Sequence, residues 1–114
     1  MKEIKAFIRP NMLDVVLRAL HEHPDFPGVT VSTVRGFGKV TGRNKEGGGG
    51  GAGFGTIEMS KLECIVDDGM ADDVVNVIRS HAVTGHPGDG KIIVTRLDSV
   101  IRIRTGDTGA SALK

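Results

Sequence analysis

A glycine-rich stretch near the middle of the chain most constrains how it can fold. Residues 41 to 55 read T-G-R-N-K-E-G-G-G-G-G-A-G-F-G and hold eight of the 17 glycines among the 114 residues. Glycine loses more backbone freedom on ordering than any other residue, so this stretch suits neither a helix nor a strand. A passive connection between strands normally takes about two to five residues, and we therefore expect a long loop with a function.

Before this loop, the apolar residues predict a strand, a helix and a second strand. Residues 3 to 9 alternate in polarity and end at a proline. Apolar residues then recur at helical spacing from Asn11, a candidate N-cap, over about 12 residues. Residues 29 to 34 alternate between apolar and hydroxyl side chains, which is typical of a half-buried strand that can continue into Gly36-Phe37-Gly38.

After the loop, the same order of elements recurs. Residues 57 to 66 alternate again, and a helix is expected from the carboxylate-rich turn at Asp67, where capping explains the acidic side chains, to Ala82. Residues 91 to 95 form a short apolar run, and residues 99 to 104 (S-V-I-R-I-R) alternate once more as a terminal strand. The small polar tail from about residue 108 to 114 is expected to be flexible.

The resulting order, βαββαβ, predicts the α+β class. We expect a single domain over residues 1–114, a ferredoxin-like sandwich in which two helices cover one face of an antiparallel sheet. Alternation leaves apolar side chains on both sides of some strands, so the other face of the sheet also needs cover. Self-association is the simplest source of that cover.

Composition excludes several functions. The 15 Lys and Arg residues nearly balance 14 Asp and Glu, giving a net charge of +1, and there is no Trp or Tyr. A nucleic-acid partner is therefore not expected, because it calls for a basic field or aromatic stacking platforms. A single cysteine cannot form an intramolecular disulfide, and no apolar run is long enough for a signal peptide or a membrane span. These features predict a cytoplasmic protein.

The segment from Thr84 to Lys91, T-G-H-P-G-D-G-K, indicates phosphate binding. Gly85-x-x-x-x-Gly90-Lys91 has the spacing of a P-loop. Ile92, however, replaces the hydroxyl residue that holds Mg²⁺ in that motif, and the expected order of helix, loop and strand is the reverse of a P-loop. The segment therefore predicts phosphate binding by another architecture.

Two arginines could complete an anion site. Arg102 and Arg104 are two residues apart on the predicted terminal strand and would point to the same face, where a phosphate or carboxylate could sit between them. Two solvated arginines on an edge strand explain the pair equally well. A hairpin that brings them toward residues 88–91 would favour a polyphosphate pocket, and the Gly36-Phe37-Gly38-Lys39 bend offers a second glycine-rich approach.

No catalytic arrangement stands out in the sequence. Ser, His and Asp occur without a spacing that marks a triad, so we expect a protein that is not an enzyme. His81 and His86 flank the 84–91 segment and could meet a metal ion, although surface histidines without a ligand are the commoner case. Cys64 is most simply a small core residue.

Four segments together resemble the PII signal-transduction proteins. They are F-I-R-P, V-R-G-F-G-K, T-G-H-P-G-D-G-K-I and V-I-R-I-R-T-G-D, and they occur in this order within residues 1 to 107. The resemblance implies a homotrimer of ferredoxin-like subunits with three clefts for ATP or ADP. It also implies a T-loop, about residues 39–56, that docks on partner proteins. Residues 84–91 would be the B-loop, and residues 102–107 part of a C-loop given by the neighbouring subunit.

The resemblance further implies which residues serve the nucleotide. The B-loop residues would cradle the phosphates, two arginines would reach across the subunit boundary, and Thr30 and Ile65 would contact the adenine. The full set is Ile8, Thr30, Gly36, Gly38, Lys39, Ile65, Gly88, Asp89, Gly90, Lys91, Arg102 and Arg104. The partner-binding loop would comprise Thr41, Gly42, Arg43, Asn44, Lys45, Glu46, Gly47, Gly48, Gly49, Gly50, Gly51 and Phe54.

The chain departs from the nitrogen-sensing members of that family at three points. Val40 stands where those members have a glutamine that helps to hold Mg²⁺ and 2-oxoglutarate. The lysine that pairs with 2-oxoglutarate would align near Met59, and no tyrosine is present for uridylylation. We expect nucleotide binding to persist and standard 2-oxoglutarate sensing to be absent or altered, with the need for Mg²⁺ open.

The divergent T-loop indicates a different partner. A membrane transporter or an efflux component, serving carbon uptake, a bicarbonate response or metal efflux, is a credible candidate. Two alternatives remain open. One is a slow ATPase that uses the same cleft, and the other is a metal-responsive PII-like protein linked to transport or efflux.

Overall fold

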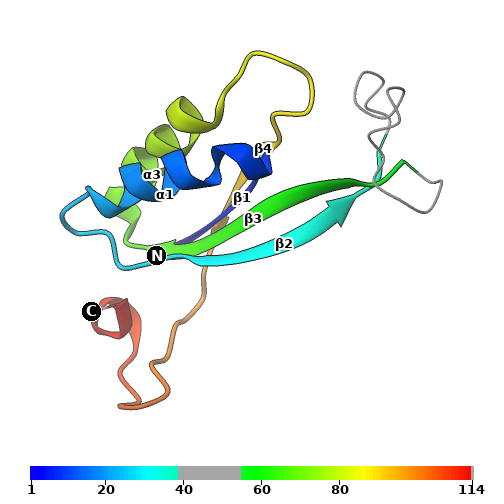
Figure 1. Cartoon of the computed structure of the whole chain (residues 1–114). Coiled ribbons are helices and arrows are strands. Elements are labelled where there is room, and N and C mark those ends of the chain that lie inside the picture. The colour runs from blue at the N-terminus through cyan, green and yellow to red at the C-terminus, as the bar shows by residue number, and fades with distance from the viewer. Residues whose placement is uncertain (39–54, 114) are drawn as a thin grey trace.

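The computed structural model describes residues 1–38 and 55–113; residues 39–54 and 114, which include Lys39, Val40 and most of the expected T-loop, lie outside the described residues. Two helices lie side by side over a sheet (Figure 1). The elements are β1 (Lys2–Ile8), a 3-10 helix (Pro10–Met12), α1 (Leu13–His21), β2 (Thr30–Gly36), β3 (Ile57–Val66), α3 (Asp68–Ala82), β4 (Lys91–Arg96) and a 3-10 helix (Gly109–Leu113).

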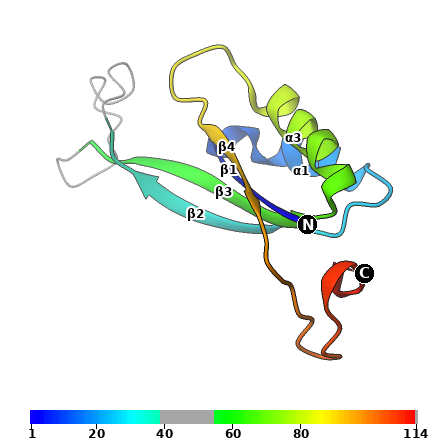
Figure 2. The same cartoon turned by 180° about the vertical axis from the view of Figure 1, so that it is seen from behind.

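The sheet has the order β2-β3-β1-β4, and each neighbouring pair is antiparallel. Phe7 of β1 lies opposite Lys61 of β3 on one side and Lys91 of β4 on the other. Both helices cover the same face, as the views from the two sides show (Figures 1 and 2). This is the ferredoxin-like α+β fold that the sequence predicted.

The hydrophobic core fills the space between the helices and the sheet. The alternating residues of β1 and β3 point into it, as do the apolar stripes of α1 and α3, which confirms the periodicities predicted for these segments. The buried cluster consists of Ile4, Ala6, Ile8, Val16, Leu20, Leu62, Cys64, Val66, Ala71, Val74, Ile78 and Ala82.

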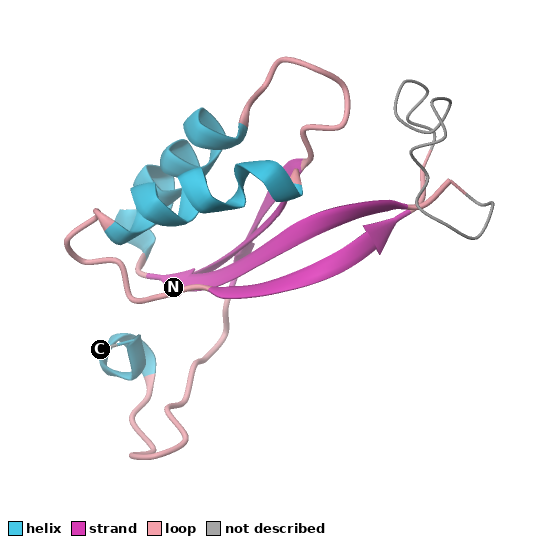
Figure 3. Cartoon of the chain, in the orientation of Figure 1, coloured by secondary structure: helices cyan, strands magenta, loops and turns pink. Residues whose placement is uncertain are grey.

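The opposite face of the sheet has no layer over it within the described part of the subunit (Figure 3). It carries partly buried side chains such as Phe7 and Ile65, the exposed Ile93, and an ion pair in which Lys61 Nζ lies 3.5 Å from Glu63 Oε1. Apolar and charged groups therefore share this face, and its apolar members gain cover only from another molecule.

Neither predicted helix start is capped by the expected side chain. Helix α1 begins at Leu13, two residues after Asn11, because Pro10 starts a 3-10 turn that precedes it. The prediction of Asn11 as N-cap was wrong. Asp67 does hold the N-cap position of α3, but its carboxylate makes no capping hydrogen bond.

The predicted terminal strand over residues 99–104 is absent. The chain leaves the sheet after β4 and forms only an isolated bridge between Ile101 and Thr108, around a turn in which Gly106 N donates to Arg102 O at 2.8 Å. Ile103 is fully exposed, so the alternation there does not reflect burial within the subunit. Residues 109–113, in the tail that was expected to be flexible, form a 3-10 helix. Residues 97–113 together make a C-terminal arm that extends away from the sheet (Figure 2).

Candidate phosphate-binding site

The loop between α3 and β4 is shaped by glycines with positive φ. Gly85, Gly88 and Gly90 have φ values of 87°, 97° and 100°, a region that side chains with a Cβ rarely adopt. At position 90, a Cβ would also lie 1.7 Å from the carbonyl oxygen of Phe7. The loop therefore lies directly against the end of β1, and only glycine fits at position 90.

The carboxylate of Asp89 ties this loop together. Its Oδ2 accepts hydrogen bonds from the backbone N–H groups of Thr84 at 2.8 Å and Gly85 at 2.9 Å, and its Oδ1 accepts one from the Thr84 hydroxyl. The same Oδ1 lies 2.8 Å from Arg9 Nε. A carboxylate offers about four acceptor positions, and these donors fill them.

Arg9 is a site residue that sequence reasoning missed. Besides its ion pair with Asp89, its Nη2 donates to Pro87 O at 2.8 Å, so one guanidinium holds two points of a loop almost 80 residues away. The hydrogen bond from Thr84 and the one from Arg9 hold the pKa of Asp89 well below its ordinary value. Asp89 therefore stays ionised and is neutralised by Arg9, and Lys91 has no ion-pair partner among the residues that the structure describes.

A cavity of about 430 Å³ opens beside the loop on the face of the sheet away from the helices. Its size is in the range of small-molecule sites. It brings together five of the predicted nucleotide residues with an apolar floor from β1, β2 and β3. The lining includes Gly36, Gly38, Gly88, Gly90 and Lys91 from the predicted set, and Phe7, Val34, Ile57 and Met59 from the floor.

Two predicted residues stand apart from this cavity. Ile8 is only 2% exposed and points into the core on the helix side of the sheet. With Asp89 it lines a separate cavity of about 350 Å³ beneath the C-terminal half of α3. Ile8 and Asp89 thus support the loop from behind, whereas Lys91 lies opposite Phe7 and shares its open face of the sheet.

Thr30 and Ile65 lie at the other end of the sheet. They line a third cavity of about 630 Å³ whose opposite wall is formed by Val100, Ala112 and Leu113 of the C-terminal arm. The same arm carries the two arginines. Both the adenine-contacting residues and the arginines implied by the resemblance therefore lie on the part of the subunit remote from the B-loop.

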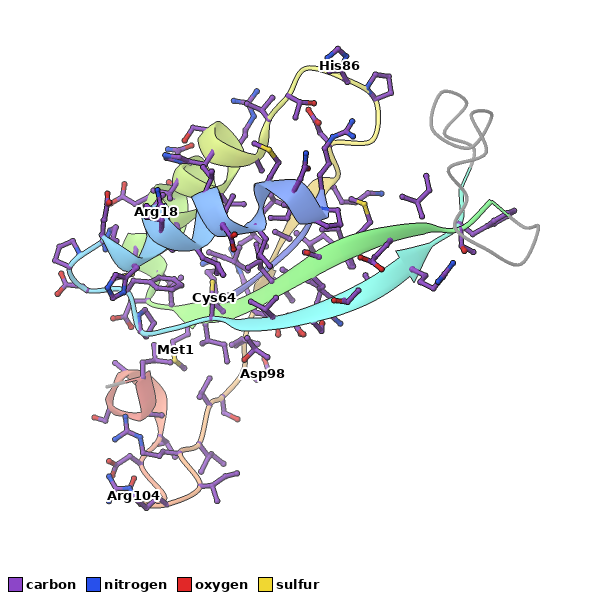
Figure 4. The ribbon with its side chains drawn as sticks, viewed as in Figure 1. Met1, Arg18, Cys64, His86, Asp98 and Arg104 are labelled. Carbon is purple, nitrogen blue, oxygen red and sulfur yellow. The ribbon has the colours of Figure 1, made fainter. Side chains whose placement is uncertain are left out.

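Arg102 and Arg104 do not form the possible hairpin with residues 88–91. Arg102 Nη2 instead donates to Ala112 O at 3.3 Å, and Arg104 is exposed at the tip of the arm. Figure 4 shows Arg104 and His86 of the loop at opposite ends of the molecule. Within one subunit the predicted residues fall into two separated sets. Thr30 and Ile65 lie at the end of the sheet away from the B-loop, and the arginines lie on the chain that leaves the sheet after β4.

The described residues contain no group of three His, Cys, Asp or Glu side chains that could hold a metal ion. His81 Nδ1 lies 2.8 Å from Val77 O of its own helix, and His86 is exposed on the loop. Burial raises the pKa of the Cys64 thiol to about 11, in keeping with the predicted core role. None of the helices described is long and apolar enough to cross a membrane.

Comparison with known proteins identifies the family of this chain. The family model described as "Nitrogen regulatory protein P-II" matches residues 1–107. The chain belongs to this family. Relatives named nitrogen regulatory protein P-II from Synechocystis sp. and Azospirillum brasilense are 42% and 38% identical over 99% of this chain and 100% of their own length. Nitrogen regulatory protein P-II 2 of Methanothermobacter thermautotrophicus is 42% identical over 99% of the chain and 97% of its own.

Membership of the P-II family fits the fold and the separation of the two residue sets. P-II proteins are regulators that assemble as trimers, bind adenine nucleotides and act on partner proteins. A trimer supplies a second subunit for the open face of the sheet and for the exposed arm.

Proposed function

We propose that this P-II protein is a trimeric regulator that binds ATP or ADP in clefts between its subunits. Nucleotide occupancy then controls how its T-loop engages a partner protein. Each cleft would join the B-loop end of one subunit to the arm of the next. The T-loop, residues 39–56, would be the element that the partner recognises.

The observation that carries this proposal is the division of the site into two half-sites. The B-loop half has glycine backbone and Lys91 around one cavity, and the other half has Thr30, Ile65 and the arginines at the far end. The residues expected to contact the base lie with the arginines on one half, and the glycine backbone and Lys91 expected to cradle the phosphates lie on the other. In a cyclic trimer, a patch at one end of a subunit meets a different patch of its neighbour, so two such halves can form one cleft.

The charges suit a di- or triphosphate. Lys91 projects from the start of β4, and the Asp89 charge beside it is already paired with Arg9. Arg104 makes no hydrogen bond or ion pair with the described residues and is exposed at the arm's tip, where a phosphate in the neighbouring half-site could accept from it. Lys91 of one subunit and arginine of the next would both donate charge-assisted hydrogen bonds to the phosphates, which a single subunit could not do.

The root of the T-loop is a wall of the same cavity, which gives a route for regulation. Gly36 and Gly38 lead from β2 toward the T-loop and line the B-loop cavity. At the other root, Thr56 Oγ1 accepts from Arg35 Nη2 at 3.0 Å. A ligand whose contacts with Gly36 and Gly38 differ between two T-loop conformations would shift the population toward the conformation that it binds better.

Calorimetric titration with ATP, ADP and AMP tests the proposal. We expect binding, and we expect Lys91→Ala or Arg104→Ala to weaken it by roughly 100-fold because each removes a charged phosphate contact. Substitutions in residues 47–51 should leave binding unchanged and abolish partner docking. No binding at millimolar nucleotide would overturn the proposal, and equal loss of affinity in the 47–51 variants would overturn the separate roles of cleft and loop.

The lining of the same cavity also indicates how the protein responds to 2-oxoglutarate. Met59 forms part of its apolar floor where a lysine would be needed to pair with a dicarboxylate. We therefore propose that 2-oxoglutarate does not bind by the standard contacts, even with ATP and Mg²⁺ present. Titration of 2-oxoglutarate into the nucleotide-saturated protein tests this, and micromolar binding would contradict it. The Met59→Lys variant measures whether this one position is limiting.

A further inference from the structure

The loop network suggests roles for Arg9 and Asp89 that differ from phosphate contact. We propose that Arg9 and Asp89 form a clamp that holds residues 84–90 in their phosphate-binding shape before any ligand arrives. Both are positioning residues, and neither side chain contacts the nucleotide. The inference rests on the proposed nucleotide site and adds to it the device that preorganises the loop.

The Asp89 carboxylate points back into its own loop. Both of its oxygens are taken by donors from Thr84, Gly85 and Arg9. A carboxylate satisfied in this way has no position left for a ribose hydroxyl, and an unneutralised one would repel phosphate. Asp89 therefore serves the loop itself, although it lies between two glycines that line the cavity.

The backbone of Arg9 is fixed at the end of β1. It follows the last residue of β1 and precedes Pro10, which restricts its backbone to the extended conformation seen here, φ −63° and ψ 137°. Its carbonyl oxygen accepts from Met12 N at 3.0 Å. The side chain is only 18% exposed and that of Asp89 23%. A rigid part of the fold thus holds a loop whose glycines would otherwise sample many conformations.

The planar guanidinium of Arg9 binds two residues of the loop at once. Nε faces Asp89 and Nη2 faces Pro87 O, each at 2.8 Å, so the planar fork fixes the spacing between two loop residues. Thr84 and Gly85 are held to the same carboxylate, which closes the loop onto itself. A loop that is ordered before the ligand arrives loses less conformational entropy on binding, and the affinity is higher for that reason.

The test uses Arg9→Met, Asp89→Asn and the double variant in the full-length protein, with ADP as the probe. Arg9→Met removes both donors, and Asn cannot satisfy two sets of donors because one side of its amide is itself a donor. We expect each single variant to weaken ADP binding by roughly 10-fold or more, and the double variant to be no weaker than the worse single one. Arg9→Lys should restore part of the affinity. Arg18→Met, on the exposed face of α1, is the matched control and should bind as the wild type does.

A measurement on the nucleotide-free protein separates this clamp from the proposed function. Hydrogen exchange at the Thr84 and Gly85 amides should be slow in the wild type and fast in Arg9→Met and Asp89→Asn. Fast exchange in the wild type would show that no clamp exists. Slow exchange that the variants abolish, with ADP affinity unchanged, would show a clamp that does not serve binding. Failure of the wild type itself to bind ADP would overturn the proposed function and the clamp's role in it, while the exchange data would still report the clamp.

Discussion

Replacing Gly90 by alanine tests whether the B-loop depends on close contact with β1. The new Cβ would lie 1.7 Å from Phe7 O and 2.8 Å from Phe7 C, and real Cβ contacts essentially never fall below 3.0 Å. Phe7 is paired with strands on both sides, so β1 cannot retreat. The loop must therefore move by at least 1.3 Å, the difference between 3.0 and 1.7 Å.

The loss of folding stability in Gly90→Ala has two parts, backbone strain and steric overlap, which variants at other glycines can separate. A side chain at φ 100° costs about 1–2 kcal/mol, and forced overpacking adds about 1–3 kcal/mol. We expect Gly90→Ala to lower the free energy of unfolding by about 2–5 kcal/mol. Gly85→Ala, at φ 87° with open space around it, should cost the strain alone, about 1–2 kcal/mol. Gly69→Ala in α3 should stabilise by about 0.5 kcal/mol.

Urea denaturation and ADP calorimetry on the three variants give the decisive comparison. A positioning error of about 1 Å can cost roughly 100-fold, so Gly90→Ala should lose about that much ADP affinity. Gly69→Ala should bind as the wild type does. If Gly90→Ala matched Gly85→Ala in both stability and affinity, the loop would not depend on contact with Phe7 and the reasoning would be wrong.

Three further predictions concern the fold. Leu62→Ala should lower the free energy of unfolding by about 2–5 kcal/mol, because it leaves a cavity under both helices; urea denaturation measures this, and a loss below about 1 kcal/mol would contradict the described core. The Cys64 thiol, with a pKa of about 11, should react with a disulfide reagent at pH 8 only in urea, and rapid reaction of the native protein would contradict its burial. Hydrogen bonds from Lys2 and the N-terminal amino group lower the Asp68 pKa to about 2, so Asp68→Asn should be less stable than the wild type at pH 7. This difference should shrink as the pH falls from 3.8 toward 2, and a constant difference would contradict the ion pair.

The sequence predicted the fold because burial leaves a periodic signal. Strands β1 and β3 alternate with one face in the core, and α3 repeats its apolar residues at helical spacing, so element type and face followed directly. Residues 99–104 show where this fails. They alternate as well, yet Ile101 and Ile103 are exposed in the subunit, because periodicity marks faces that need cover without saying which molecule provides it.

The sequence could place Gly88, Gly90 and Lys91 together in one loop, because their spacing along the chain is short. The clamp was not, because Arg9 and Asp89 are 80 residues apart and only the antiparallel pairing of β1 with β4 brings them together. The signal that could have found Arg9 was its place beside Pro10 at the end of a core strand. The direction of the Asp89 carboxylate was also beyond prediction, because a sequence shows that a residue lies in a loop and not which way its side chain points.

The central claim is that each nucleotide cleft is shared by two subunits, and mixed trimers test it most directly. Lys91→Ala and Arg104→Ala proteins should each fail to bind ADP tightly alone. Co-purified trimers that contain both variants should regain one tight site each, where the intact Lys91 of one subunit faces the intact Arg104 of its neighbour. Calorimetry that finds one tight ADP site per mixed trimer would support the shared cleft. No recovery of tight binding in verified mixed trimers would contradict it.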